Sequence, residues 1–151
     1  VNQTPRTPKE IATIFHLDNT SATKGCKNAT TIINTIEKDF ENMDKTDLGN
    51  TTPICFLDRY CSRLNLSNEI TSLCKFIAKK IEKNNYIPEN TPNAIAAGII
   101  YFVSLVCNLD TNKRNIHNIS EISEVTINKC CKKLEKYEAE LIPSAIRRKY
   151  Y

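Results

Sequence analysis

The segment from residue 123 to residue 136 carries side chains that can bind nucleic acid. A helix predicted here presents Val125, Thr126, Asn128 and Lys129 in its first turn. Side chains of these types contact thymine methyl groups, base edges and phosphates when a helix enters the major groove. At about 100° per residue, one side of the helix collects four lysines: Lys129, Lys132, Lys133 and Lys136. A lysine face on an isolated helix is more often simply solvated. The neighbouring elements therefore decide whether this face binds nucleic acid or is only a solvated surface.

Two helices joined by a turn are predicted to position these side chains. The first covers residues 112–120, where Ile116 and Ile119 begin a spacing of three that continues to Ile122 in the turn. Ser123 is a natural N-cap for the second, over residues 123–137. The side of this second helix opposite the lysines is apolar, with Ile127, Cys131 and Leu134, and Leu141 beyond its end continues the same stripe. A short helix, a three-residue turn and an amphipathic helix are typical of a helix-turn-helix, which favours nucleic-acid binding.

The same pattern occurs 105 residues earlier in the chain. Ile11, Ile14 and Leu17 correspond to the three apolar residues of the later helix, and Lys24, Cys26 and Lys27 correspond to Lys129, Cys131 and Lys132. The alternative is that these matches arise by coincidence in a chain rich in Ile and Lys. However, all six positions match at one offset without a gap. The pattern therefore predicts two related helical units, the first with helices over 9–18 and 22–38. Since it opens close to Val1, we expect this unit to be truncated.

Composition indicates an all-α fold without a membrane span. Hydrophobic residues make up 40% of the chain, whereas it has only three Gly and six Pro, too few for the turns of a sandwich or barrel. Cap and proline signals predict further helices over 52–64, 67–84 and 91–107. The last is apolar on every side but too short to cross a bilayer, so we expect a buried central helix and no membrane partner.

The residues with reactive side chains do not form a catalytic or metal-binding pattern. The seven cysteines include no C-x-x-C pair, and the two histidines lie far apart. We expect no metal, no cofactor and no disulfide, but buried free thiols in a reducing compartment. We also expect that the adjacent Cys130 and Cys131 cannot both face one core. The absence of a glycine-rich phosphate loop and of a nucleophile motif argues against an enzyme.

Residues from about Cys55 to Pro143 resemble the C-terminal cyclin-like repeat of the transcription factor IIB family. The segments that carry the resemblance are 59–66 (RYCSRLNL), 76–80 (FIAKK), 87–88 (IP), 91–101 (TPNAIAAGIIY), 113–114 (KR) and 123–127 (SEVTI). Residues 6–11 (RTPKEI) are similar to the end of the first repeat of the same family. The expected domains are thus the C-terminal part of a first repeat (1–40), a linker (41–50), a second repeat (51–143) and a tail (144–151).

The resemblance implies a general transcription initiation factor that binds the complex of TATA-box-binding protein with promoter DNA. It implies that the helix-turn-helix of the second repeat enters the major groove upstream of the TATA element, with Val125 and Asn128 reading bases. The further DNA-binding candidates are Thr126, Lys129, Lys132, Lys133, Arg114, Asn90 and Thr91. The family's zinc ribbon is absent from these residues, so contact with RNA polymerase II is expected outside them. The implied location is the nucleus, or a cytoplasmic viral factory for a large DNA virus.

Three single positions and one short segment depart from the family pattern. Asn128 and Asn90 replace frequent arginines; Asn suits adenine as Arg suits guanine, and the helix that follows Asn90 can still hold a phosphate at its N-terminus. Glu121 replaces a glycine in the turn, which is costly if the site needs a positive φ. Residues 18–20 stand where basic residues are common, which weakens the expected contact of the first repeat with the TATA-box-binding protein.

Two other functions compete with this interpretation. The RNA polymerase III counterpart of the family shares the repeats, and only flanking sequence separates the two. A cyclin-like adaptor that regulates a kinase is the second alternative. The lysine-faced last helix argues against the adaptor, because a kinase-binding cyclin has no use for a recognition helix.

Overall fold

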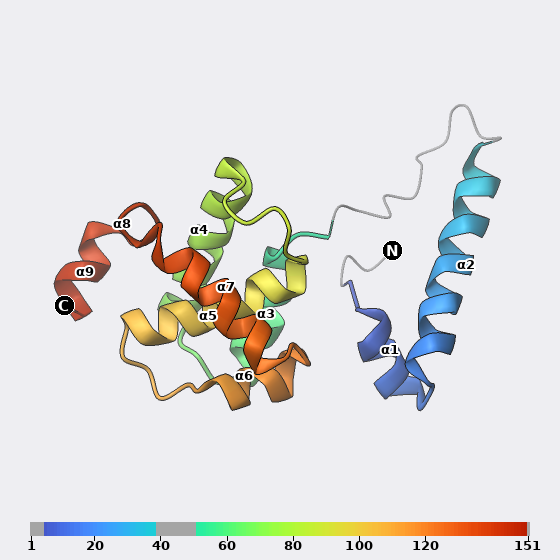
Figure 1. The fold of residues 1–151 in the computed structure, drawn as a ribbon, viewed down its shortest axis with the longest axis horizontal. Helices are drawn as coiled ribbons and strands as arrows, with labels where there is room; N and C mark the ends of the chain where they lie inside the picture. Colours follow the sequence, from blue (N-terminus) through green and yellow to red (C-terminus); the bar gives the residue numbers. More distant parts are fainter. Residues whose placement is uncertain (1–4, 39–50, 151) are drawn as a thin grey trace. The chain divides into compact units, whose positions relative to one another are not determined.

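The computed structural model describes residues 5–38 and 51–150, which fold as two compact units divided between residues 50 and 51 (Figure 1). Within these residues the regular structure is helical throughout, which confirms the predicted all-α fold. The predicted linker, 41–50, lies outside the described residues. Among the described helices, none has the length and apolar character needed to cross a membrane.

The first unit consists of α1 (Pro8–Phe15) and α2 (Asn19–Lys38). Thr7 begins α1 with a capping box, since its hydroxyl accepts from the Glu10 amide at 3.1 Å and the Glu10 carboxylate accepts from the Thr7 amide at 2.9 Å. His16 adopts the left-handed backbone and ends α1, and Asp18 caps α2 by accepting from the Ser21 amide at 2.8 Å. The turn therefore covers residues 16–18. It comes earlier than the turn over 19–21 that follows from the helix bounds 9–18 and 22–38 predicted from apolar spacing.

The first unit leaves most of its apolar side chains exposed. Its buried residues in the described part are Ala12 and Ala22, whereas five larger apolar side chains lie at the surface: Ile14, Phe15, Leu17, Ile32 and Ile36. Two helices alone cannot enclose a core.

The second unit contains five main helices, as predicted, and two short ones. The main helices are α3 (Ile54–Arg63), α4 (Asn68–Asn84), α5 (Pro92–Val106), α6 (Lys113–Ser120) and α7 (Glu124–Glu135). The short ones are α8 (Glu138–Leu141) and α9 (Ser144–Tyr150). The segment that sequence alone predicted as a tail thus forms a helix, and Lys149 of α9 pairs with Glu69 of α4 at 2.8 Å.

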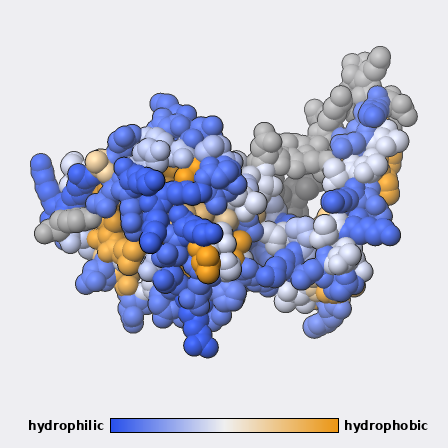
Figure 2. Space-filling view, viewed as in Figure 1, coloured by the Kyte–Doolittle hydropathy of each residue, from blue (hydrophilic) through white to orange (hydrophobic). Residues whose placement is uncertain are grey.

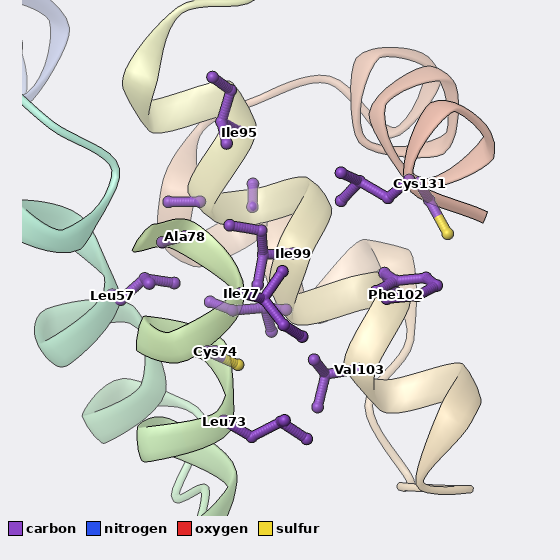
Figure 3. Close-up of a cluster of buried hydrophobic side chains, with 14 of the residues drawn as sticks. Leu57, Leu73, Cys74, Ile77, Ala78, Ile95, Ile99, Phe102, Val103 and Cys131 are labelled. Carbon is purple, nitrogen blue, oxygen red and sulfur yellow. The ribbon is translucent and has the colours of Figure 1, made fainter. Parts of the chain in front are cut away.

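The core forms around α5, which confirms the prediction that this helix is the most buried. Thr91 and Pro92 begin it as predicted, and nearly every side chain up to Val106 is buried. Figure 3 shows Ile99 of α5 beside Ile77 of α4. The predicted apolar stripe of α4 is buried throughout: Ile70, Leu73, Cys74, Ile77 and Ile81. On its other side Lys79 and Lys83 are exposed.

Helix α7 packs on α5 so closely that both adjacent cysteines are buried. A Cβ built on Gly98 of α5 lies 2.4 Å from the Cβ of Cys130, a separation that only a glycine permits. Cys130 and Cys131 are both fully covered, but only Cys131 belongs to the hydrophobic core cluster; their burial does not contradict the prediction that they cannot both face one core. Because Gly98 has no side chain, α7 lies close to α5, and this close packing covers Cys130 as well as Cys131. All seven cysteines are free thiols.

Candidate nucleic-acid interface

Helices α6 and α7 are joined by the three residues 121–123, and both have side-chain caps. Asn112 begins α6 by accepting from the Asn115 amide at 2.9 Å. Ser123 begins α7, as predicted, by accepting from the Thr126 amide at 3.2 Å. Between them Glu121 has a φ of 58°, and its amide donates to the His117 carbonyl at 2.7 Å. The site therefore does need a positive φ, and a residue with a Cβ is strained there by about 1–2 kcal/mol.

Hydrogen bonds inside the turn fix the angle between the two helices. His117 Nδ1 lies 2.9 Å from the carbonyl oxygen of Ile122. Because a carbonyl can only accept, Nδ1 carries the proton and donates. The buried Ser120 hydroxyl donates to the Ile116 carbonyl at 2.7 Å and accepts from the Ile122 amide at 3.2 Å. Sequence analysis did not identify His117 or Ser120 as contributors, although both stand next to the turn.

The first turn of α7 presents Val125 to solvent. Val125 is 64% exposed, Asn128 is half-buried one turn later, and Lys129 is exposed. The Thr126 hydroxyl lies 2.9 Å from the Ser123 hydroxyl, so it takes part in the cap. Of the four side chains predicted for this turn, Val125 and Lys129 are thus exposed, Asn128 is half-buried, and Thr126 takes part in the cap.

The lysines of α7 differ in their partners. Lys129, Lys132 and Lys136 are exposed, as expected for the first two, and the described part of the chain gives them no ion-pair partner. Lys133 is different: it pairs with the Glu89 carboxylate, and its Nζ donates to Asn90 Oδ1 at 3.0 Å. Its side chain is 37% exposed. Lys133 is half-buried rather than exposed as predicted, because the loop before α5 folds against it. On the face that carries α7, the surface is largely hydrophilic (Figure 2).

Asn90, just before the start of α5, contacts Lys133, and Thr91 is the next residue. Thr91 donates its hydroxyl proton to Asn93 Oδ1 at 2.7 Å, and this same oxygen accepts from the Ala94 amide at 3.1 Å. Asn93 is therefore the side chain that covers the helix start. Arg114 is exposed in the first turn of α6. The structure thus joins Asn90 and Lys133, and it adds Glu89, which no local sequence signal connects to a residue 44 positions away.

The two units repeat this geometry at the offset seen in the sequence. Helix α1 (Pro8–Phe15) corresponds residue for residue to α6 (Lys113–Ser120), and α2 begins at the residue equivalent to the start of α7. His16 is left-handed like Glu121, with φ values of 53° and 58°. The duplication is thus visible in the backbone as well as in the side-chain types.

No group of three or more His, Cys, Asp or Glu that could hold a metal ion occurs within residues 5–38 and 51–150. Burial raises the pKa of the Cys130 and Cys131 thiols, the latter to about 12. These thiols are thus poor ligands and poor nucleophiles at neutral pH.

Comparison with known proteins relates the chain to transcription initiation factors. Residues 46–137 match the family model described as the transcription factor TFIIB repeat. A transcription initiation factor IIB-like protein of Acanthamoeba polyphaga mimivirus is 31% identical over 142 residues, which cover 94% of this chain and 30% of that protein. Transcription initiation factor IIB of Methanosarcina mazei is 31% identical over 93 residues, covering 61% and 28%. That of Drosophila virilis is 28% identical over 99 residues, covering 66% and 34%. The matches span about three tenths of each relative.

Proposed function

Because this chain belongs to the transcription factor TFIIB repeat family, we propose that it is the promoter-binding part of a transcription initiation factor. Its second unit has the all-α, cyclin-like fold of that family. In this proposal α6 and α7 act as a helix-turn-helix, and α7 enters the major groove of promoter DNA upstream of the TATA element. The partner is the complex of the TATA-box-binding protein with that DNA.

The observation that carries the proposal is the exposed first turn of α7. Val125 is 64% exposed at the start of a helix whose opposite side is fully packed on α5. Asn128 follows it, and Lys129 and Lys132 extend into solvent beside it. A helix N-terminus with apolar and amide side chains for bases, next to cations for phosphates, has the composition of a recognition helix.

The side chains divide into two groups by the contacts they can make. Lys129, Lys132 and Arg114 are exposed cations, and their contacts to phosphates give affinity without sequence preference. Val125 can pack on a thymine methyl group, and Asn128 can pair with adenine N6 and N7. Asn90 and Thr91, at the N-terminus of the 15-residue helix α5, can contact a phosphate.

The remaining proposals concern the first unit, the contact with RNA polymerase II and the place of action. We propose that the first unit is the C-terminal part of a first repeat and that contact with RNA polymerase II lies outside residues 1–151. The proposed place of action is the nucleus, or a cytoplasmic viral factory; the similarity to a mimivirus protein favours the second.

A mobility-shift experiment tests this function. The chain is mixed with a TATA-containing duplex, with the TATA-box-binding protein present or omitted. We expect a slower complex that needs all three components and weakens as salt rises. If the chain leaves the mobility of the preformed complex unchanged over the whole salt range, the proposal is wrong. The kinase-regulating adaptor then becomes the better interpretation.

A further inference from the structure

The Lys133–Glu89 ion pair lies within the proposed DNA-binding surface. Lys133 is one turn after Lys129, so the two lysines share a side of α7. The Glu89 carboxylate is 58% exposed and belongs to the loop that leads into α5. It stands two residues before Thr91, the N-cap of that helix. A negative charge is thus held beside two features that attract phosphate, a lysine and a helix N-terminus.

A carboxylate in this position competes with a DNA phosphate for the same lysine. Lys133 has few remaining donors, because its Nζ contacts both Glu89 and Asn90. To reach a phosphate it must leave Glu89, and the freed carboxylate then faces the anionic DNA backbone. The lysine also favours the charged form of its partner, because its hydrogen bond lowers the pKa of Glu89.

We propose that Glu89 is a specificity-determining residue that occupies Lys133 and thereby lowers the affinity of this chain for DNA of any sequence. The inference rests on the proposed function, since it assumes that this surface meets DNA. The base-reading residues Val125 and Asn128 lie one to two turns earlier on α7, outside the ion pair. Glu89 therefore reduces the phosphate contacts common to all duplexes and leaves the base contacts intact.

Titration of a fluorescent duplex of random sequence with the 151-residue chain tests the role of Glu89. Glu89→Gln removes the charge and keeps an oxygen that can accept from Lys133. We expect tighter binding and a salt slope steeper by up to ~0.9, the value for one additional neutralised phosphate. From that slope, the gain is roughly three-fold larger at ~50 mM than at ~200 mM salt. The double variant Glu89→Gln/Lys133→Gln should lose the gain.

A matched control separates this local effect from net charge. Glu69→Gln also removes one carboxylate from an exposed ion pair with a lysine, Lys149, but away from α7. It should change affinity much less than Glu89→Gln. Equal gains from both variants mean that only net charge matters, and this overturns the role of Glu89.

A second comparison does not depend on how Glu89→Gln folds. If Lys133 is occupied, Lys133→Gln should reduce the affinity and salt slope less than Lys129→Gln. Equal losses from the two lysine variants contradict the inference. Its failure is distinguishable from failure of the proposed function: in the first case the wild-type chain still retards the complex of the TATA-box-binding protein with TATA DNA, but Glu89→Gln binds the random duplex no better. In the second case the wild-type chain does not retard that complex.

Discussion

Gly98 of α5 and Cys130 of α7 meet at a distance that admits no further carbon atom between their backbones. The Cβ of an alanine at 98 falls 2.4 Å from the Cβ of Cys130, and the contact is with the base of a side chain, which cannot turn away. This contact sets how deeply α7 sits on α5, and with it the position of the first turn that we propose to meet DNA.

Gly98→Ala should therefore destabilise the second unit. Added volume in a packed core costs about 1–3 kcal/mol, which exceeds the gain of ~1 kcal/mol from replacing glycine in a helix. Urea unfolding followed by circular dichroism measures the change. Gly25→Ala in α2 is the control, because a Cβ there meets nothing within 4 Å and should be neutral or stabilising. A Gly98→Ala chain as stable as the wild type would show that α7 can shift freely.

Lysines on α7 should matter more for DNA binding than lysines elsewhere. Replacing Lys129 and Lys132 by alanine should weaken binding to any duplex and reduce the salt slope by up to ~0.9 for each phosphate that is no longer neutralised. Replacing Lys79 and Lys83, which are exposed on α4, removes the same charge from another helix. The prediction fails if both pairs lower the salt slope equally, since the lysines of α7 would then be only a solvated face.

Asn128→Arg should change which bases are preferred. Arg pairs with guanine O6 and N7, whereas Asn pairs with adenine, and such a contact discriminates by roughly 1–3 kcal/mol. Selection from a randomised duplex should show guanine gaining at one upstream position, together with a small gain in overall affinity from the added charge. An identical selected motif for wild type and variant would mean that this helix contacts only the DNA backbone.

Stability should fall at alkaline pH through Cys131. Burial first, and the Glu135 carboxylate second, raise the pKa of this thiol from 9.0 to about 12. Above pH 9 the unfolded chain ionises this thiol, while the folded chain keeps it neutral. The contribution of Cys131 to the free energy of unfolding is therefore complete below pH 9 and is lost as pH rises toward 12. Urea unfolding of wild type and Cys131→Ala across this range checks the prediction: the wild type should decline more steeply. Parallel declines would assign the loss to other groups.

The features that sequence predicted well are those set by neighbours in the chain. Ser123 caps α7 and Ser67 caps α4 because a hydroxyl reaches an amide three residues on. The stripe of α4 is buried as predicted because its period is that of the helix. Glu121 could be identified as a strained position because the family has glycine there.

The features that sequence did not predict depend on contacts between distant elements. Glu89 and Lys133 are separated by 44 positions, and either alone is an ordinary surface charge. The burial of Cys130 depends on Gly98, which helical periodicity of α7 cannot reveal. The position of α9 likewise involves distant residues, since Ile146 and Tyr150 pack against the core and Lys149 pairs with Glu69. The roles of Val125, Asn128 and Arg114 on DNA stay predictions.

Site-specific photo-cross-linking tests the central claim most directly. A photo-reactive amino acid replaces Asn128 in α7, and in a matched chain it replaces Glu82, which is exposed on α4. Both chains are irradiated with TATA DNA and the TATA-box-binding protein. We predict cross-links from position 128 to bases upstream of the TATA element, dependent on the TATA-box-binding protein, and few from position 82. Equal cross-linking from both positions, or none from position 128 in a complex that forms, would contradict the proposed recognition role of α7.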